Sequence, residues 1–332
     1  MVNSSRAKER RSPADPSPTR GSARRLTPPL RAVGVGIVAV MTYLVLLAVG
    51  RAAIPDYEDS GYPLWAGVAS IAIVVWGFVF SVGVAALRHS RESAERRLGG
   101  WWAGAISAYV VFALAVSVTL GLFISGAGGA DWLTVLIRSL AWIAAGPWIM
   151  LIWIGHEQVA AAHAMIMDVD APVPADEFDP AQIDGPAVTR AIDALDRIWD
   201  VIESSSLALA AVLSTAVINT GTLRTVRIAN GRLEEDDFPS WWVLGLGVFF
   251  ALVLVAVLAP IVARWRKEGL LLVDQALGDP RSGVPSESQL GAKDRLLRRI
   301  RVDRPLLLRP VAALSVLAPF LTAFVTSVVP TA

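Results

Sequence analysis

The chain has 332 residues and a formal net charge of +1, and its composition is strongly apolar, with 54% hydrophobic residues, 18% charged residues and a mean hydropathy of +0.54. Soluble domains carry a smaller apolar share and more charge, so this composition argues against a soluble globular protein. Cysteine is absent, which excludes disulfides, iron–sulfur clusters and thiolate zinc sites. Among the 30 basic residues only three are lysines, a bias that suggests a bacterial source.

The amino-terminal segment, residues 1–31, mixes Ser, Pro and Arg with almost no large apolar side chain. A segment of this kind buries too little surface to offset the entropy of an ordered chain. We therefore predict a disordered, basic tail over residues 1–31.

Seven apolar stretches follow the tail, and most have the ~20 residues that an α-helix needs to cross ~30 Å of hydrocarbon. They cover residues 33–49, 64–87, 101–124, 132–154, 204–223, 241–263 and 306–329. Most lack the polar residue at every third or fourth position that a soluble amphipathic helix shows. The sequence therefore predicts an all-α, polytopic membrane protein with about seven transmembrane helices, of which four lie in 32–155, two in 204–263 and one in 306–332.

Arginine and lysine predict the orientation, because short loops rich in these residues stay on the cytoplasmic side. If the amino terminus is inside, the cytoplasmic segments hold 24 of the 30 basic residues and the outer loops hold four. The other two, Arg138 and Arg309, lie within apolar stretches but near enough to their ends to reach lipid headgroups. We expect a plasma-membrane protein with its amino terminus in the cytoplasm and its carboxyl terminus outside.

The stretch 204–223 is the weakest of the seven, because its apolar centre, 207–218, has only 12 residues. Without it the chain would have six spans, and the basic residues would divide into 17 inside and 11 outside, so the charge distribution favours a span. Small and polar residues line one face of this stretch, namely Ser204, Ala208, Ala211, Thr215, Asn219 and Thr222. Such a stripe is typical of close helix packing. The alternative is that Thr215, Asn219 and Thr222 line a solute path.

An acidic segment, residues 156–203, lies on the predicted cytoplasmic side and carries 11 acidic residues against two arginines. It ends in a predicted amphipathic helix over 187–202, whose apolar face is formed by Val188, Ile192, Leu195, Trp199 and Ile202. An acidic helix avoids anionic lipid, so we expect this face to contact protein, either a partner or a second copy. If the helix continues into the next span, about 40 residues would reach ~60 Å.

A basic segment, residues 264–305, carries ten basic and six acidic residues on the same predicted side. In an interfacial helix its apolar residues would face lipid and its arginines would bind anionic headgroups. The apolar set is Leu290, Leu296, Leu297 and Ile300, and the arginines are Arg295, Arg298, Arg299 and Arg301. Docking onto the acidic segment is the competing interpretation.

No residue pattern predicts a catalytic, metal or cofactor site. His156, Glu157 and His163 lack the spacing of a zinc protease, because seven helical residues place the two histidines ~10 Å apart. The acidic run over 168–179 is interrupted by prolines and lacks EF-hand spacing. Hydrolase, Walker A and dinucleotide motifs are also absent from the sequence, which argues against an enzyme.

Three classes of function remain. The first is a membrane scaffold, assembly factor or regulatory protein that acts through its acidic and basic segments, because the distinctive charges lie outside the membrane. The alternative is a small-solute transporter or channel that uses 132–154, interrupted at Gly146-Pro147, and the polar stretch 204–223. A membrane-embedded enzyme is the third. The expected partners are anionic lipid headgroups and a protein or second copy at 156–203, and not nucleic acid.

Overall fold

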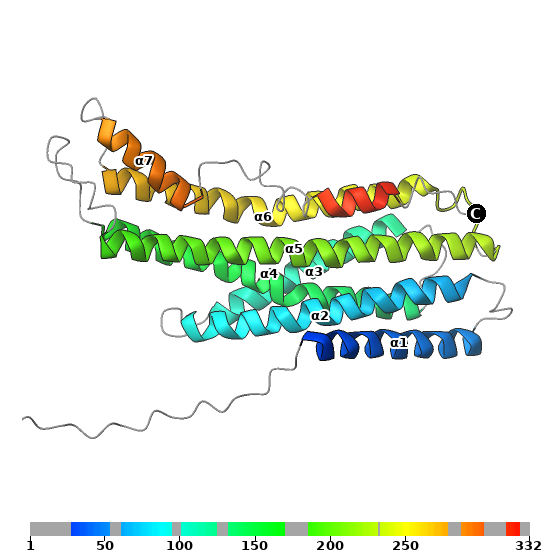
Figure 1. Cartoon of the computed structure of the whole chain (residues 1–332). Helices are drawn as coiled ribbons and strands as arrows, with labels where there is room; N and C mark the ends of the chain where they lie inside the picture. Colours follow the sequence, from blue (N-terminus) through cyan, green and yellow to red (C-terminus); the bar gives the residue numbers. More distant parts are fainter. Residues whose placement is uncertain are drawn as a thin grey trace, which may run out of the picture.

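The computed structural model describes residues 28–53, 61–94, 101–124, 132–169, 185–231, 233–277, 287–301 and 317–325. Figure 1 labels the helices α1 (Pro28–Ala53), α2 (Tyr62–Ala94), α3 (Trp101–Ile124), α4 (Trp132–Met167), α5 (Pro186–Ala229), α6 (Ser240–Leu277) and α7 (Glu287–Arg299). A short unlabelled helix over 317–325 packs against α6. The described residues contain no strand, so the all-α prediction is confirmed for this part of the chain.

Four helices are long and apolar enough to cross a membrane. These helices cover Tyr62–Ser90, Val135–Met167, Pro186–Ala229 and Ser240–Leu277, and each contains an apolar stretch of 18 residues. The third of them includes the doubtful stretch 204–223. Large apolar side chains also lie on the surface of these helices, among them Phe78 (62% exposed) and Leu252 (63% exposed). A surface of this kind suits contact with lipid and not with water. The helices are therefore those of a membrane protein.

The other three predicted spans are represented only in part. α1 and α3 contain shorter apolar helices, Ile37–Ala52 and Ala103–Val118. The predicted stretch 306–329 lies outside the described residues except for 317–325. The predicted tail 1–31 also lies outside them, except that residues 28–31 belong to the first turn of α1.

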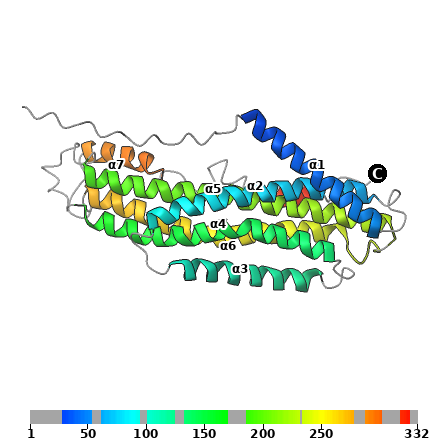
Figure 2. The ribbon, with the colours of Figure 1, turned by 90° about the horizontal axis from the view of Figure 1, so that it is seen from below.

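α4 and α5 form the centre of the molecule. They contact each other more extensively than any other pair of described helices, and α2 and α6 each pack against both. α1 contacts α2, and α3 contacts α4, so these two helices lie at the periphery (Figure 2). The elongated bundle has two ends: the α7 end, with α7, the start of α5 and the end of α6, and the loop end, with residues 230–239 between α5 and α6 (Figure 1).

α4, α5 and α6 extend toward the α7 end by 13 to 18 residues beyond the predicted apolar stretches. At 1.5 Å per residue these extensions add roughly 20 to 27 Å. They bury a core of their own, which includes Ile166, Ile192, Leu195, Trp199, Trp265 and Leu272. α5 is one helix of 44 residues, so the predicted amphipathic helix continues into the next span. All five residues of its apolar face are buried against this chain's own helices, so the prediction that this face contacts a partner or a second copy is wrong.

α7 packs against α6 and completes this core. Leu296 and Ile300 are each only 1% exposed, so the prediction that they face lipid is wrong. Leu290 is 51% exposed and Leu297 is half-buried. In the rest of the basic segment, the indole N–H of Trp265 in α6 donates to the carbonyl oxygen of Leu195 in the acidic segment at 3.0 Å. This contact agrees with the competing interpretation, in which the basic segment docks onto the acidic one.

Candidate functional site

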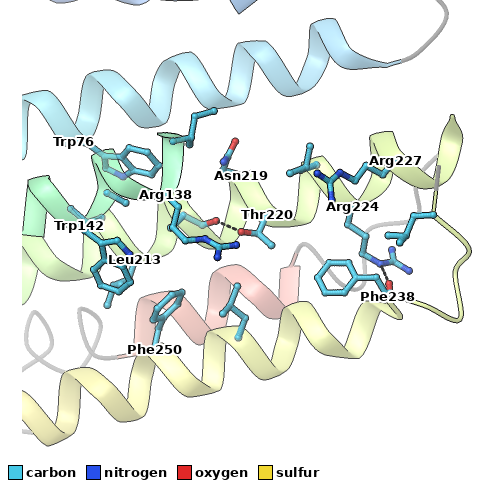
Figure 3. A pocket seen from close by; sticks show the side chains of 17 residues that line it. Trp76, Arg138, Trp142, Leu213, Asn219, Thr220, Arg224, Arg227, Phe238 and Phe250 are labelled. Carbon is cyan, nitrogen blue, oxygen red and sulfur yellow. Dashed lines mark hydrogen bonds between the residues drawn. The ribbon is translucent and has the colours of Figure 1, made fainter. Parts of the chain in front are cut away.

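A cavity of about 100 Å³ lies between α2, α4, α5 and α6 in the half of the bundle nearer the loop end. Figure 3 shows that its two ends differ in chemistry. The end deeper in the bundle is lined by Trp76, Trp142, Leu213 and Phe250, and the end nearer the loop by Arg138, Asn219, Thr220, Arg224 and Arg227. The lining therefore combines an apolar, aromatic part with a cationic part that contains three arginines and no acidic residue.

The aromatic end is fixed by contacts between helices. The indole N–H of Trp76 in α2 donates a hydrogen bond to Oγ1 of Thr215 in α5, at 2.8 Å. Thr215 itself donates to the carbonyl oxygen of Ala211 at 2.7 Å. Trp142 packs edge-on against Phe112 of α3, with ring centroids 6.0 Å apart. The rings thus form a wall whose shape is held by the bundle.

At the cationic end, Arg224 is held by protein contacts among the described residues and Arg138 is not. Arg224 donates from Nε to the carbonyl oxygen of Phe238 and lies 3.4 Å from Oε1 of Glu235, which is exposed. Arg138 of α4 is half-buried and has no ion pair or hydrogen bond to any residue that the structure describes. An arginine at this depth normally pairs with a carboxylate or reaches the headgroups. Here the residue lines the cavity instead (Figure 3).

Two neutral polar groups in the lining are buried and unsatisfied. Asn219 is only 8% exposed, and its Oδ1 has no hydrogen-bond partner within the described ranges. The indole nitrogen of Trp142 is likewise buried without an acceptor there. A buried polar group without a partner costs about 1–3 kcal/mol, so most such groups in proteins bind another residue, a water or a ligand.

The helices close together on the side of the cavity toward the α7 end. Gly83 of α2 faces Trp148 of α4, and a Cβ atom at this position would lie 2.8 Å from the indole nitrogen. That indole N–H donates to the carbonyl oxygen of Val79 at 3.0 Å. Further along, Gly155 of α4 meets Ile261 of α6 in the same way. Tight packing therefore forms the floor of the cavity.

The predicted solute path is only partly the one that the structure shows. Of Thr215, Asn219 and Thr222, only Asn219 lines the cavity. Thr215 bonds Trp76, and Thr222 donates to the carbonyl oxygen of Ile218 at 2.9 Å. Thr220, Arg224 and Arg227 also line the cavity, although no sequence pattern above predicts them. They follow one another at helical spacings of four and three, so they share one helix face. Hydropathy ends the apolar stretch at 223 and places Arg224 and Arg227 in a loop, whereas α5 continues to Ala229.

The other predicted contact residues lie at the α7 end. Arg295, Arg298, Arg299 and Arg301 are exposed, and their contact with lipid headgroups stays a prediction. His163 contacts Glu268 of α6, with Nδ1 and Oε2 2.8 Å apart, and does not meet His156. No group of three His, Asp or Glu side chains in the described part of the chain is placed to hold a metal ion.

No known protein family, curated protein or solved structure matches this chain. The cavity and the exposed charges at the α7 end are therefore the features that point to a function.

Proposed function

We propose that the chain is a multi-pass membrane protein of the plasma membrane that binds a small solute in the cavity, as the first step of its transport. The proposal includes seven spans, with the amino terminus and the α7 end in the cytoplasm and the loop end outside. The positive-inside distribution of arginine and lysine supports this orientation. In this orientation, the cavity lies in the outer half of the membrane.

The observation that carries the proposal is the cavity with its unpaired Arg138 and its unsatisfied Asn219. Its walls come from α4, which contains Pro147, and from α5, which carries the polar stripe. Polar and charged residues inside a membrane bundle are costly and are typically kept at solute or ion paths. This argument favours solute binding over a purely structural role for these helices.

Access to the cavity tests the proposal, and the cysteine-free chain gives a clean background. Thr220→Cys places a thiol in the cavity wall, whereas Leu252→Cys places one on the lipid-facing surface of α6. We expect an impermeant, negatively charged thiol reagent added outside intact cells to modify Thr220→Cys and to leave Leu252→Cys unmodified. Asp179→Cys, in the predicted cytoplasmic segment, should react only after the cells are permeabilised.

Two outcomes would contradict the proposal. If Thr220→Cys reacts only after permeabilisation, the cavity does not open outside. If Leu252→Cys reacts as fast as Thr220→Cys, labelling reports general exposure and not a cavity.

A second candidate function is a scaffold or regulatory role at the α7 end. The observation in its favour is that the extensions of α4, α5 and α6 pack with α7 into a bundle beyond the apolar stretches, with exposed acidic side chains such as Asp193 and Asp200. Contact between this surface and a partner protein or a second copy would support the scaffold role over solute binding.

A further inference from the structure

We infer that the ligand of the cavity is an amphipathic anion, which consists of one carboxylate or phosphate group and a single short apolar tail. This inference rests on the proposed function, because it names the class of solute that the cavity takes. The anionic group lies at Arg138 and the tail against the aromatic end.

The charge of the lining selects an anion. Arg138, Arg224 and Arg227 contribute three guanidinium groups, and no carboxylate lines the cavity. Glu235 lies outside the lining, where it contacts Arg224 at the exposed rim. Arg138 has no counter-ion among the residues described, and a buried charge is strongly unfavourable unless it is paired. Carboxylate and phosphate are the groups that a guanidinium binds best, because its donors match their oxygens in geometry.

One buried donor on the aromatic wall, about one helical turn from Arg138, points to the same head group. Trp142 follows Arg138 by four residues on α4, so the two side chains lie on one face of that helix. The Trp142 indole N–H is buried without an acceptor among the residues described, and an indole nitrogen is a donor only. A ligand with acceptor oxygens satisfies both the indole and the guanidinium, whereas a cation satisfies neither. The unsatisfied atom of Asn219 is the acceptor Oδ1, which takes a donor such as water and not an anionic oxygen.

The aromatic end selects an apolar tail. Trp76, Leu213 and Phe250 present apolar surface, and the Trp76 indole N–H is already bonded to Thr215. A sugar or nucleotide placed there would lose its hydrogen bonds to water without replacement, which is unfavourable. An alkyl chain gains from burial against the same surface. Inorganic phosphate fits the arginines but leaves this end of the cavity empty.

The ligand test uses the full chain in nanodiscs of neutral phosphatidylcholine and radiolabelled butyl phosphate, a probe whose short tail suits a cavity of about 100 Å³. We expect saturable binding that raises the melting temperature of the protein. Butyrate should displace the probe, whereas inorganic phosphate and uncharged butanol should displace it at least tenfold less well. A diacyl anionic lipid carries the same charged group but two long chains, so phosphatidylglycerol in the nanodisc should not compete with the probe. Competition by phosphatidylglycerol would assign the site to a membrane lipid and overturn the short-tailed ligand.

Substitutions test the assigned residue. Arg138→Met should weaken binding at least tenfold, and Arg138→Lys should restore part of the affinity because it keeps the charge. Arg51→Met is the matched control, because it removes a positive charge from the last turn of α1 without touching the cavity lining. It should change the affinity less than twofold. A monodisperse elution profile for each variant shows that a loss of binding is not a loss of folding.

The outcomes separate the ligand class from the proposed function. Butanol binding as tightly as butyl phosphate, or unchanged binding in Arg138→Met, would overturn the amphipathic anion. If Thr220→Cys is modified from outside while no amphipathic anion binds or slows that modification, the cavity is a solute site for another class of ligand. If Thr220→Cys is not accessible from outside, the proposed function fails as well. Slower modification of Thr220→Cys in the presence of butyl phosphate, but not of butanol, supports both the ligand class and the proposed function.

Discussion

Gly83 and Gly77 lie on the same helix, α2, but in different surroundings. A Cβ atom at Gly83 would lie 2.8 Å from Nε1 of Trp148 and 2.9 Å from Cβ of Pro147. A Cβ atom at Gly77 would meet nothing within 4 Å. Trp148 cannot easily move away, because it is buried and its indole N–H bonds the carbonyl oxygen of Val79. Glycine at position 83 is therefore what allows α2 and α4 to close the floor of the cavity.

This contrast predicts opposite effects of the same substitution. Gly83→Ala should destabilise the protein by about 1–3 kcal/mol, the usual cost of overpacking a well-packed interior. Gly77→Ala should be neutral or stabilising by up to about 1 kcal/mol, because alanine favours a helix more than glycine does. Thermal unfolding of the two variants in the same nanodiscs measures the difference. Equal melting temperatures would show that the α2–α4 contact at Gly83 is not tightly packed.

Arg138 shows why the site was only partly predictable from the sequence. Its distance from the start of its apolar stretch was evident, and from that depth an arginine side chain ordinarily reaches the headgroups. Whether it faces lipid or the interior depends on which helices surround α4, and hydropathy along one helix does not specify those neighbours. The same holds for the polar stripe of α5. Spacing placed Thr215 and Asn219 on one face, but only the position of Trp76 in α2 satisfies Thr215 and leaves Asn219 in the cavity.

At the scale of the helices, apolar content predicted the four helices that are long enough to span a membrane, but not where those helices end. The continuous α5 follows from a run without internal proline or glycine breaks between Pro186 and the apolar stretch. The extension of α4 to Met167 was missed because hydropathy falls after 154. A helical signal was nevertheless present, since Val159, Ala162 and Ile166 recur at spacings of three and four and are all buried.

α7 offers a matched pair of leucines for testing the packing of this extension. Leu296→Ala removes a side chain that is 1% exposed and should cost about 2–5 kcal/mol in local stability. Leu290→Ala removes one that is 51% exposed and should change stability by less than about 0.5 kcal/mol. Hydrogen exchange of residues 287–299 in the full chain is the measurement, because separation of α7 from α6 exposes its amides. Equal exchange in the two variants would mean that α7 is not docked as the structure has it.

At the scale of the whole molecule, the cavity lies toward one end of the bundle, and the exposed acidic and basic helix surfaces lie at the other. The cavity and its arginines lie toward the loop end, whereas the acidic face of α5 and the basic end of α7 lie at the α7 end. The two candidate functions therefore use different surfaces, and one does not exclude the other. Asp193 and Asp200 are exposed on α5 at this end. These exposed carboxylates are the groups that a basic partner surface would bind.

A photo-crosslinker introduced at Asp193 tests whether protein contacts this surface in native membranes. We expect a protein adduct there, either with a partner or with a second copy. We expect none from the same crosslinker at Leu252, which lies on the exposed apolar surface of α6. Asp200→Lys should reduce the adduct, because it reverses one charge of the acidic face about two turns away on α5. Raised salt should reduce it as well, since exposed charges are screened. If Asp193 yields no protein adduct at any ionic strength while the membrane fraction and the fold are intact, the scaffold role is refuted, and the cavity remains the site at which the chain acts.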